Sequence, residues 1–430
     1  MAVEKSRESF VEKSETWQHS LSGILCHVGR GGRQIEPGII AVSDIMKDIA
    51  SGMHRILGEG AFRVFTKAQA LEREGKKILH FEIGQPDFPT PPHIKQAAKQ
   101  AIDNDFTGYV AFDGIIELKD AIQDEIEKTR GYRPSLKQIL ILPGAKPGIF
   151  FTMLATVNPG EEIIYPDPGF PAYGSVTKYL NARDVPISLK EEDEFRLNPE
   201  AIRENITSKT KLIILNSPQN PTGSVMTKEE LEEVALLAEE HEVYVLADEI
   251  YSKMTYDTAF HSATIRDEAK DRTILLDGFS KSHSMTGWRL GYIVGPERLI
   301  EKMGLLMINA ISCTASFVQK AGVAALKGSQ DPLETMINAF RERRDAIVKG
   351  LNEIAGFSCQ PPQGAFYAFP NIKKTGMTSN EMADYLLYKA GVACLPGNDF
   401  GSNGEGYLRF SYATSVNVIK KAIQRIKDSF

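Results

Sequence analysis

The chain has little that would support a disulfide framework, a membrane anchor or a nucleic-acid interface. Its four cysteines are scattered singly, without the pair spacing that disulfide scaffolds and zinc sites use. No apolar run approaches the roughly 20 residues that cross a bilayer, and Glu, Lys and Ser interrupt the first 20 positions, where a secretory signal would be apolar. The formal net charge of −6 gives no electrostatic case for nucleic acid. We therefore expect a cytoplasmic protein without a nucleic-acid, membrane or metal partner.

The length of 430 residues exceeds what one small core needs and fits two domains. Residues 1–60 read as an N-terminal extension, with seven Lys and Arg residues against eight Asp and Glu residues. A DNA-reading arm would be positive, so this balance argues against one. Apolar residues at helical spacing predict a helix over 45–57, which we expect to pack on the main body or on a partner subunit.

After this extension, strands and helices alternate. Helices are expected at 62–74, 92–102 and 116–129, and a short strand at 78–83. Apolar runs that predict buried strands occupy 139–142, 162–165, 211–215, 243–247, 272–276 and 290–294. Several are separated by helical patterns, as at 148–157 and 228–239, which is typical of a mostly parallel α/β sheet. Residues 297–326 look helical. Residues 356–430 mix short strands with helices, which indicates a second, α+β domain.

Lys281 follows the apolar run 272–276, and Arg289 lies eight residues further on. An unprotonated lysine amine attacks carbonyls to form a Schiff base, and the planar fork of arginine binds phosphate in two places. Together they supply what a pyridoxal phosphate site needs. A single lysine after a strand is more often a surface residue, so the interpretation depends on the other stretches.

Two turns could receive the phosphate and the ring of such a cofactor. Gly144 and Ala145 lie between a strand and a helix, where free N–H groups and the helix dipole favour an anion; a plain strand-to-helix turn is the alternative. Phe170 follows a strand end and could stack on a flat heteroaromatic ring. An ordinary core aromatic would account for it equally well.

Two further strand ends carry polar groups. Asn220, in the run Asn216-Ser-Pro-Gln-Asn-Pro-Thr-Gly223, could donate to a phenolate-type oxygen, although a turn explains the Pro and Gly residues. Asp248 could keep a pyridinium nitrogen protonated, with Tyr251 reaching the ring oxygen. A helix cap or a metal ligand is the alternative for Asp248, and no His or Cys stands at ligand spacing.

Arg409 stands in the middle of a short apolar strand, Tyr407-Leu-Arg-Phe-Ser411. An arginine among apolar neighbours usually has an anionic partner. A substrate carboxylate and a structural salt bridge would both serve.

Taken in order, these stretches resemble fold-type I pyridoxal-phosphate enzymes, and most of all the class I and II aminotransferases of the aspartate aminotransferase superfamily. The resemblance covers about residues 62–430. Its motifs are Asn216–Gly223, Ala247-Asp-Glu-Ile-Tyr251 and Ser280-Lys281 through Gly287-Trp-Arg-Leu-Gly-Tyr292, supported by Gly84-Gln-Pro-Asp87, Gly364-Ala-Phe-Tyr367 and Tyr407-Leu-Arg409. The fold that it implies is a large cofactor-binding domain (91–326) with a mostly parallel seven-stranded sheet, and a smaller α+β domain from both chain ends (61–90 and 327–430).

The resemblance also implies roles for single residues. Lys281 would hold the cofactor as a Schiff base and move the α-proton, while Asp248 would pair with the ring nitrogen. Tyr109 would reach the cofactor phosphate of a second subunit, which makes a homodimer with shared active sites the expected assembly. The other implied cofactor contacts are Gly144, Ala145, Lys146, Phe170, Asn220, Tyr251, Ser280 and Arg289, and the implied substrate contacts are Gly84, Asn220 and Arg409.

Lys146 raises the question of substrate. In some family members a lysine at this turn contacts the distal carboxylate of dicarboxylic substrates. Here it follows Gly-Ala rather than the commoner Gly-Gly, and Pro147 stands where Gln is frequent. A solvated surface lysine is the alternative.

The expected function is ping-pong transfer of an amino group from an L-amino acid to a 2-oxo acid, with 2-oxoglutarate as the expected acceptor. Lys281 would act as the general base at the substrate Cα. Another reaction on the same cofactor, such as β-elimination, a cyclising lyase reaction or an oxidase reaction, would use the same residues. A non-catalytic regulator is the third alternative.

Overall fold

The computed structural model describes residues 49–268 and 270–430, and Ala50–Phe430 form one compact unit. Most of the N-terminal extension, including positions 45–48 of the expected helix, lies outside the described residues. The rest of that expected helix contains only a 3-10 turn, η2 (Ser51–His54). Among the described residues, no helix combines the length and the apolar character that crossing a bilayer requires.

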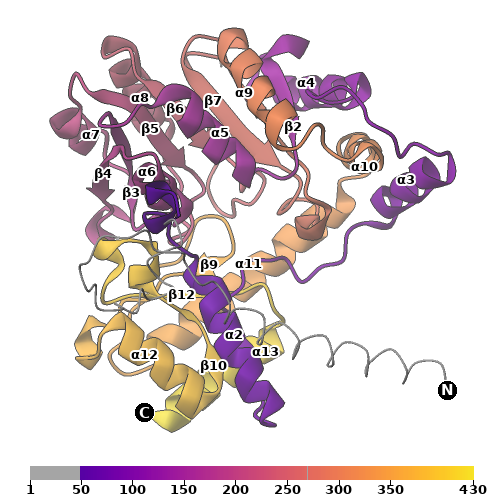
Figure 1. Cartoon of the computed structure of the whole chain (residues 1–430). Coiled ribbons are helices and arrows are strands. Elements are labelled where there is room, and N and C mark those ends of the chain that lie inside the picture. The colour runs from indigo at the N-terminus through magenta and orange to yellow at the C-terminus, as the bar shows by residue number, and fades with distance from the viewer. Residues whose placement is uncertain (1–48, 269) are drawn as a thin grey trace, which may run out of the picture. The chain divides into compact units, whose positions relative to one another are not determined.

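A seven-stranded sheet with the order β2-β8-β7-β6-β5-β3-β4 forms the centre of the unit (Figure 1). β8 runs antiparallel to both of its neighbours, and the other neighbouring pairs are parallel. The strands are β2 (Ile139–Leu142), β3 (Glu162–Asp167), β4 (Arg183–Ser188), β5 (Thr210–Asn216), β6 (Tyr244–Asp248), β7 (Thr273–Gly278) and β8 (Gly291–Val294). Each of the six predicted apolar runs forms one of these strands, which confirms the predicted fold class.

Strand β4 was not predicted from the sequence. It lies at the edge of the sheet, and most of its residues are exposed or half-buried. Pro186, which has no N–H to donate, is tolerated at such an edge. The strand therefore lacks the continuous apolar run that identified its neighbours.

Helices cover both faces of the sheet. Alternate residues of a strand point to opposite faces. Leu140 and Leu142 belong to a core shared with α5, α6 and α9, whereas Ile139 and Ile141 belong to one shared with α3, α4 and α10. The bounds are α3 (Pro92–Asp103), α4 (Ile116–Arg130), α5 (Lys146–Thr156), α6 (Ala172–Tyr179), α7 (Pro199–Asn205), α8 (Lys228–Glu240), α9 (Glu297–Ala310) and α10 (Ser316–Lys327). Burial on both faces explains why the strands read as unbroken apolar runs.

Two smaller sheets lie below the large sheet in the view of Figure 1, and one of them joins the beginning of the unit to its end. β1 pairs in parallel with β10, so residues 79–80 lie beside residues 392–393. A second small sheet has the order β11-β12-β9. The elements are α2 (Gly60–Arg73), β1 (Leu79–His80), α11 (Asp331–Asn352), β9 (Tyr367–Ala368), α12 (Ser379–Tyr385), β10 (Val392–Ala393), β11 (Leu395–Pro396), β12 (Leu408–Ser411) and α13 (Val416–Ser429).

Candidate active site

A cavity of about 460 Å³ lies at the carboxyl ends of the central strands, a size typical of small-molecule sites. Asn216 and Asp248 are the last residues of β5 and β6, and Lys281 follows the end of β7. Parallel sheets bind ligands at this edge because the loops that leave the strands meet there. The predicted site residues that line the cavity are Gly84, Ala145, Lys146, Phe170, Asn220, Asp248, Tyr251, Ser280, Lys281, Arg289 and Arg409.

The amine of Lys281 points into this cavity. Its Nζ donates a hydrogen bond to the backbone oxygen of Gly84 at 2.6 Å and lies 5.9 Å from the centre of the Tyr251 ring. Burial first, and then the positive charges of Arg409, Lys146 and Arg289, lower the pKa of the Lys281 amine to about 8. A lysine with such a pKa is unprotonated in a substantial fraction of molecules near neutral pH, as a nucleophilic amine needs to be.

Asp248 is buried at the end of β6. One carboxylate oxygen accepts from the hydroxyl of Tyr173 at 2.8 Å, and the other accepts from the backbone N–H of Ile250 at 3.4 Å. Burial raises the pKa of the Asp248 carboxyl to about 6, although these hydrogen bonds oppose the rise. A buried carboxylate gains from a nearby cation, and a protonated ring nitrogen would be one.

Arg409 extends from β12 into the cavity and is buried. Its Nη1 donates to Asn220 Oδ1 at 3.2 Å, and its Nη2 donates to the backbone oxygen of Glu82. The guanidinium lies over the rings of Tyr367 and Phe400, at 4.6 and 5.0 Å from their centres. Its buried Nε has no partner among the described residues, and none of their carboxylates forms an ion pair with it. A buried guanidinium without an ion-pair partner among the described residues favours a substrate carboxylate over the structural salt bridge.

The end of the cavity near α5 suits a phosphate. Gly144 has a positive φ of 92°, and a Cβ there would come within 2.1 Å of Arg289 Nη2. Only glycine lets the turn and the guanidinium approach so closely. Arg289 Nη1 donates to the backbone oxygen of Thr286 at 2.7 Å, and Ala145 caps the N-terminus of α5. The guanidinium and the helix N-terminus both favour an anion.

Two tyrosines at the site, Tyr367 and Tyr173, were given no role from the sequence. The hydroxyls of Tyr251 and Tyr367 lie 2.7 Å apart, and burial holds the pKa of the Tyr251 hydroxyl well above its usual range. Tyr367 belongs to the run Gly364-Ala-Phe-Tyr, so its motif was recognised but not its contact. Tyr173, which binds Asp248, had no sequence signal because only the fold brings residues 75 positions apart together.

The mouth of the cavity holds another contact that was not predicted. Lys146 forms an ion pair with Glu59, the residue before α2, and its Nζ lies 5.2 Å from the centre of the Phe170 ring. Phe170 lines the cavity as expected. Tyr109, by contrast, has 90% of its surface exposed and does not line the cavity of its own chain.

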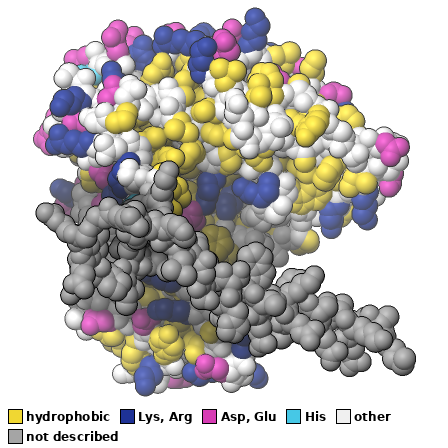
Figure 2. Space-filling model, viewed as in Figure 1, with side chains coloured by type: hydrophobic (Ala, Val, Ile, Leu, Met, Phe, Trp, Pro, Cys, Tyr) yellow, Lys and Arg dark blue, Asp and Glu magenta, His cyan; other side chains and the backbone are white. Residues whose placement is uncertain are grey.

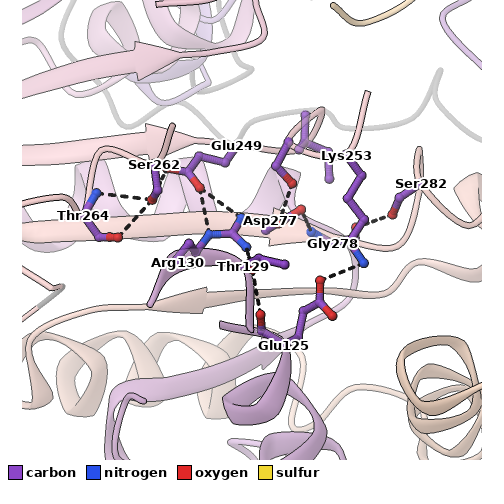
Figure 3. Close-up of polar contacts among 12 residues, drawn as sticks. Glu125, Thr129, Arg130, Glu249, Lys253, Ser262, Thr264, Asp277, Gly278 and Ser282 are labelled. Carbon is purple, nitrogen blue, oxygen red and sulfur yellow. Dashed lines mark hydrogen bonds and ion pairs between the residues drawn. The ribbon is translucent and has the colours of Figure 1, made fainter. Parts of the chain in front are cut away.

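A buried ionic triad links the end of α4 to the strand segments of β6 and β7 (Figure 3). Arg130, the last residue of α4, binds Glu249 Oε2 at 2.9 Å and Asp277 Oδ2 at 2.8 Å. Glu249 directly follows Asp248, and Asp277 lies in β7 four residues before Lys281. Ser262 and the backbone N–H of Ala263 also donate to Glu249. The triad therefore links the two segments that carry Asp248 and Lys281.

The site residues fit pyridoxal phosphate. A deprotonatable lysine, a buried carboxylate and an anion-binding turn lie around one cavity, at positions suited to the aldehyde, the ring nitrogen and the phosphate. No group of His, Cys, Asp and Glu side chains among the described residues could hold a metal ion.

Comparison with known proteins agrees with this geometry. The model of a family described as aminotransferase class I and II matches residues 76–426. An aspartate aminotransferase of Pyrococcus horikoshii is 39% identical over 366 residues, which cover 85% of this chain and 92% of that protein. Aromatic-amino-acid aminotransferase 2 of Thermococcus litoralis is 38% identical, over 85% of this chain and 94% of that protein.

Solved structures agree as well. An aspartate aminotransferase from Thermus thermophilus, solved with maleate, superposes with a TM-score of 0.86 at 32% identity, covering 90% of this chain and all of that one. The predicted enzyme class and cofactor are thereby confirmed. The chain belongs to the class I and II aminotransferases, pyridoxal-phosphate-dependent enzymes that transfer an amino group between an amino acid and a 2-oxo acid.

Proposed function

We propose that Lys281 holds the cofactor covalently and then moves the proton between the substrate Cα and the cofactor. When bound, pyridoxal phosphate supplies an aldehyde that condenses with amines and a ring that takes up the electron pair left at Cα. The observation that carries this assignment is the position of the Lys281 amine in the cavity, together with Asp248, Asn220 and Arg289. Its lowered pKa suits both attack on a carbonyl and general-base work.

The remaining residues of the site position and polarise. Asp248 pairs with the ring nitrogen and keeps it protonated, which makes the ring a better electron acceptor. Asn220 and Tyr251 hold the ring hydroxyl, and Phe170 packs on the ring face. Gly144, Ala145, Ser280 and Arg289 form the phosphate site, and Lys146 lies beside them at the start of α5.

Substrate binding depends on Arg409. Its buried guanidinium has no ion-pair partner among the described residues, and a substrate α-carboxylate would supply one. Asn220, already bonded to Arg409, and the backbone at Gly84 line the same place. Fixing the carboxylate there orients the bond that breaks at Cα toward Lys281.

We propose 2-oxoglutarate as the acceptor and an acidic or aromatic L-amino acid as the donor. The relatives named above act by their names on aspartate and on aromatic amino acids. Lys146 lies at the cavity mouth, where a distal carboxylate could reach it.

A donor screen tests the proposed function. The purified holoenzyme would be incubated with 2-oxoglutarate and each amino acid in turn, with glutamate and the new 2-oxo acid quantified. We expect equal amounts of the two products for at least one acidic or aromatic donor. Pyruvate and ammonia released from a cysteine conjugate, without glutamate, would mean a lyase instead.

The assembly we propose is a homodimer with shared active sites. Phe112 packs on Gly304 of α9, and this region exposes large apolar side chains; Figure 2 shows apolar side chains at the surface over α9. An exposed apolar patch of this kind is typical of a protein interface. The exposed apolar residues around it are Tyr109, Phe112, Ile116, Leu305, Ile308 and Ile311.

Mixing two damaged subunits tests whether sites are shared. If Tyr109 serves the neighbouring site, a mixed dimer of Tyr109→Ala and Lys281→Ala chains contains one site with both native residues. We expect the mixture to exceed either variant alone in amino transfer. No recovery in mixtures whose mixed dimers are verified by mass would contradict the shared site.

Two further predictions from the sequence remain proposals. We propose that residues 61–90 and 327–430 act as a small domain beside a large domain of residues 91–326, and the pairing of β1 with β10 supports this division. We propose a cytoplasmic location, which fractionation of cells that express the full chain would check.

A further inference from the structure

The Lys146–Glu59 ion pair lies at the mouth of the cavity, where the distal part of a substrate would enter. Both residues line the same cavity as Lys281 and Arg409. Lys146 begins α5, and Glu59 precedes α2, so the fold brings together residues that are 87 positions apart. Glu59 thus places a carboxylate of the protein on the cation that would receive a substrate carboxylate.

The segment that carries Glu59 is anchored on both sides. Arg55 Nε donates to the backbone oxygen of Lys178 at 2.8 Å, and the backbone N–H of Leu57 donates to Ser175 Oγ at 2.8 Å. After Glu59, Arg63 of α2 forms an ion pair with Asp399 at 2.8 Å. These contacts fix the chain on either side of residue 59, which places the side chain of Glu59 at the cavity beside Lys146.

The ion pair is nevertheless exchangeable. The side chains of Lys146 and Glu59 are 50% and 26% exposed, and ion pairs with this access to water stabilise a protein little. A dicarboxylic ligand could replace Glu59 without leaving Lys146 unpaired, and the released carboxylate would return to water. A ligand with a neutral side chain offers no such exchange, and the pair would stay closed.

We propose that Glu59 is a specificity-determining residue that competes with the distal carboxylate of acidic substrates for Lys146. It neutralises Lys146 when a neutral or aromatic side chain is bound, and a distal carboxylate displaces it. Glu59 thereby reduces the preference for acidic substrates and lets one cavity accept both classes. This inference rests on the proposed function, because it assumes that substrates bind with the α-carboxylate at Arg409.

Binding of two unreactive ligands tests the proposal. Maleate represents dicarboxylic substrates and 3-phenylpropanoate represents aromatic ones, and calorimetry on the holoenzyme gives the dissociation constant of each. For Glu59→Gln we expect maleate to bind about two- to fivefold more tightly, the range set by an exposed ion pair. The affinity for 3-phenylpropanoate should change by less than about twofold, because that ligand has no distal carboxylate to bind Lys146.

A double-mutant cycle locates the effect on Lys146. In a Lys146→Gln background, Glu59→Gln should leave the affinity for maleate unchanged, since the competitor and its target are then both absent. Asp384→Asn is a matched control. Asp384 forms an exposed ion pair at 2.8 Å with Lys67, and Lys67 lies in α2, the helix that follows Glu59. This control should change neither affinity.

Three results would overturn the proposal: an unchanged ratio of the two affinities in Glu59→Gln, weaker maleate binding, or an equal gain in the Lys146→Gln background. The last would mean that Glu59 acts by general repulsion. Failure of the proposed function would appear separately, as absence of amino transfer by the unmodified holoenzyme in the donor screen.

Discussion

Two groups of charged residues flank the cavity and differ in their access to water. In the triad next to Asp248, the side chains of Arg130, Glu249 and Asp277 are 1%, 4% and 8% exposed. In the pair at the mouth of the cavity, Lys146 and Glu59 are 50% and 26% exposed. Water cannot replace a partner lost from the triad, whereas it readily replaces one lost from the pair.

This difference in exposure suits the triad to a structural role and the Lys146–Glu59 pair to a role in substrate selectivity. The triad joins the segments after β6 and within β7, and therefore fixes the spacing between Asp248 and Lys281. Burial raises the pKa of both the Glu249 and the Asp277 carboxyls, and the charge of Arg130 opposes that rise. The pair, in contrast, can open at little free-energy cost, which is what a group that chooses among substrates needs.

The largest effect should come from breaking the triad. Arg130→Met keeps much of the side-chain volume but leaves two buried carboxylates without their cation, which should reduce the free energy of unfolding by about 3–5 kcal/mol. Urea unfolding of the apoenzyme measures it. Arg133→Met is the matched control, because Arg133 lies close by in the chain and is 42% exposed; it should cost at most about 1 kcal/mol. Equal losses for the two variants would remove the distinction between buried and exposed groups.

Arg409 differs from both groups, because its guanidinium is buried like the triad but has no ion-pair partner among the described residues. Arg409→Gln removes the charge that would bind the α-carboxylate, a charged hydrogen-bonding partner worth about 1.5–3 kcal/mol, so kcat/KM should fall about 10- to 150-fold. Both acidic and neutral donors should suffer alike, since every amino acid has this carboxylate. A loss confined to acidic donors would place Arg409 at the distal carboxylate instead.

The reactivity of Lys281 with pH provides the third test. In the apoenzyme its pKa is lowered from 10.5 to about 8, mainly by burial, so the amine is protonated below that pH and free above it. Labelling of Lys281 by an amine-reactive reagent, followed by mass spectrometry, should rise through a midpoint near 8. Lys146→Gln removes one of the neighbouring positive charges, and the midpoint should therefore move upward. A midpoint near that of surface lysines in both proteins would contradict the account.

The smallest effect belongs to Lys146. We expect Lys146→Ala to lower kcat/KM for dicarboxylic donors by about two- to fivefold more than for neutral donors, as fits a half-exposed cation. Steady-state kinetics with aspartate and with phenylalanine would measure both. Equal losses for both donors would remove the acidic-substrate role of Lys146.

The sequence was sufficient to predict those site residues that come directly after a buried strand. Buried parallel strands read as apolar runs, and polar residues just after them, such as Asp248 and Lys281, had to meet at one edge of the sheet. Contacts between distant segments could not be predicted in this way. Arg130 follows the helix expected at 116–129 and was given no role, and Glu59 belonged to an extension without an assigned role. Edge strand β4 was missed because its exposed residues and Pro186 hide the strand pattern.

The proposed chemistry requires that Lys281 is the residue that carries the cofactor. The most direct measurement is borohydride reduction of the full-length protein loaded with pyridoxal phosphate, followed by peptide mass spectrometry. We expect one phosphopyridoxyl group per chain, attached at Lys281, and no labelling of the cavity in Lys281→Ala. A protein that stays colourless with the cofactor, and in which reduction attaches nothing at position 281, would contradict it.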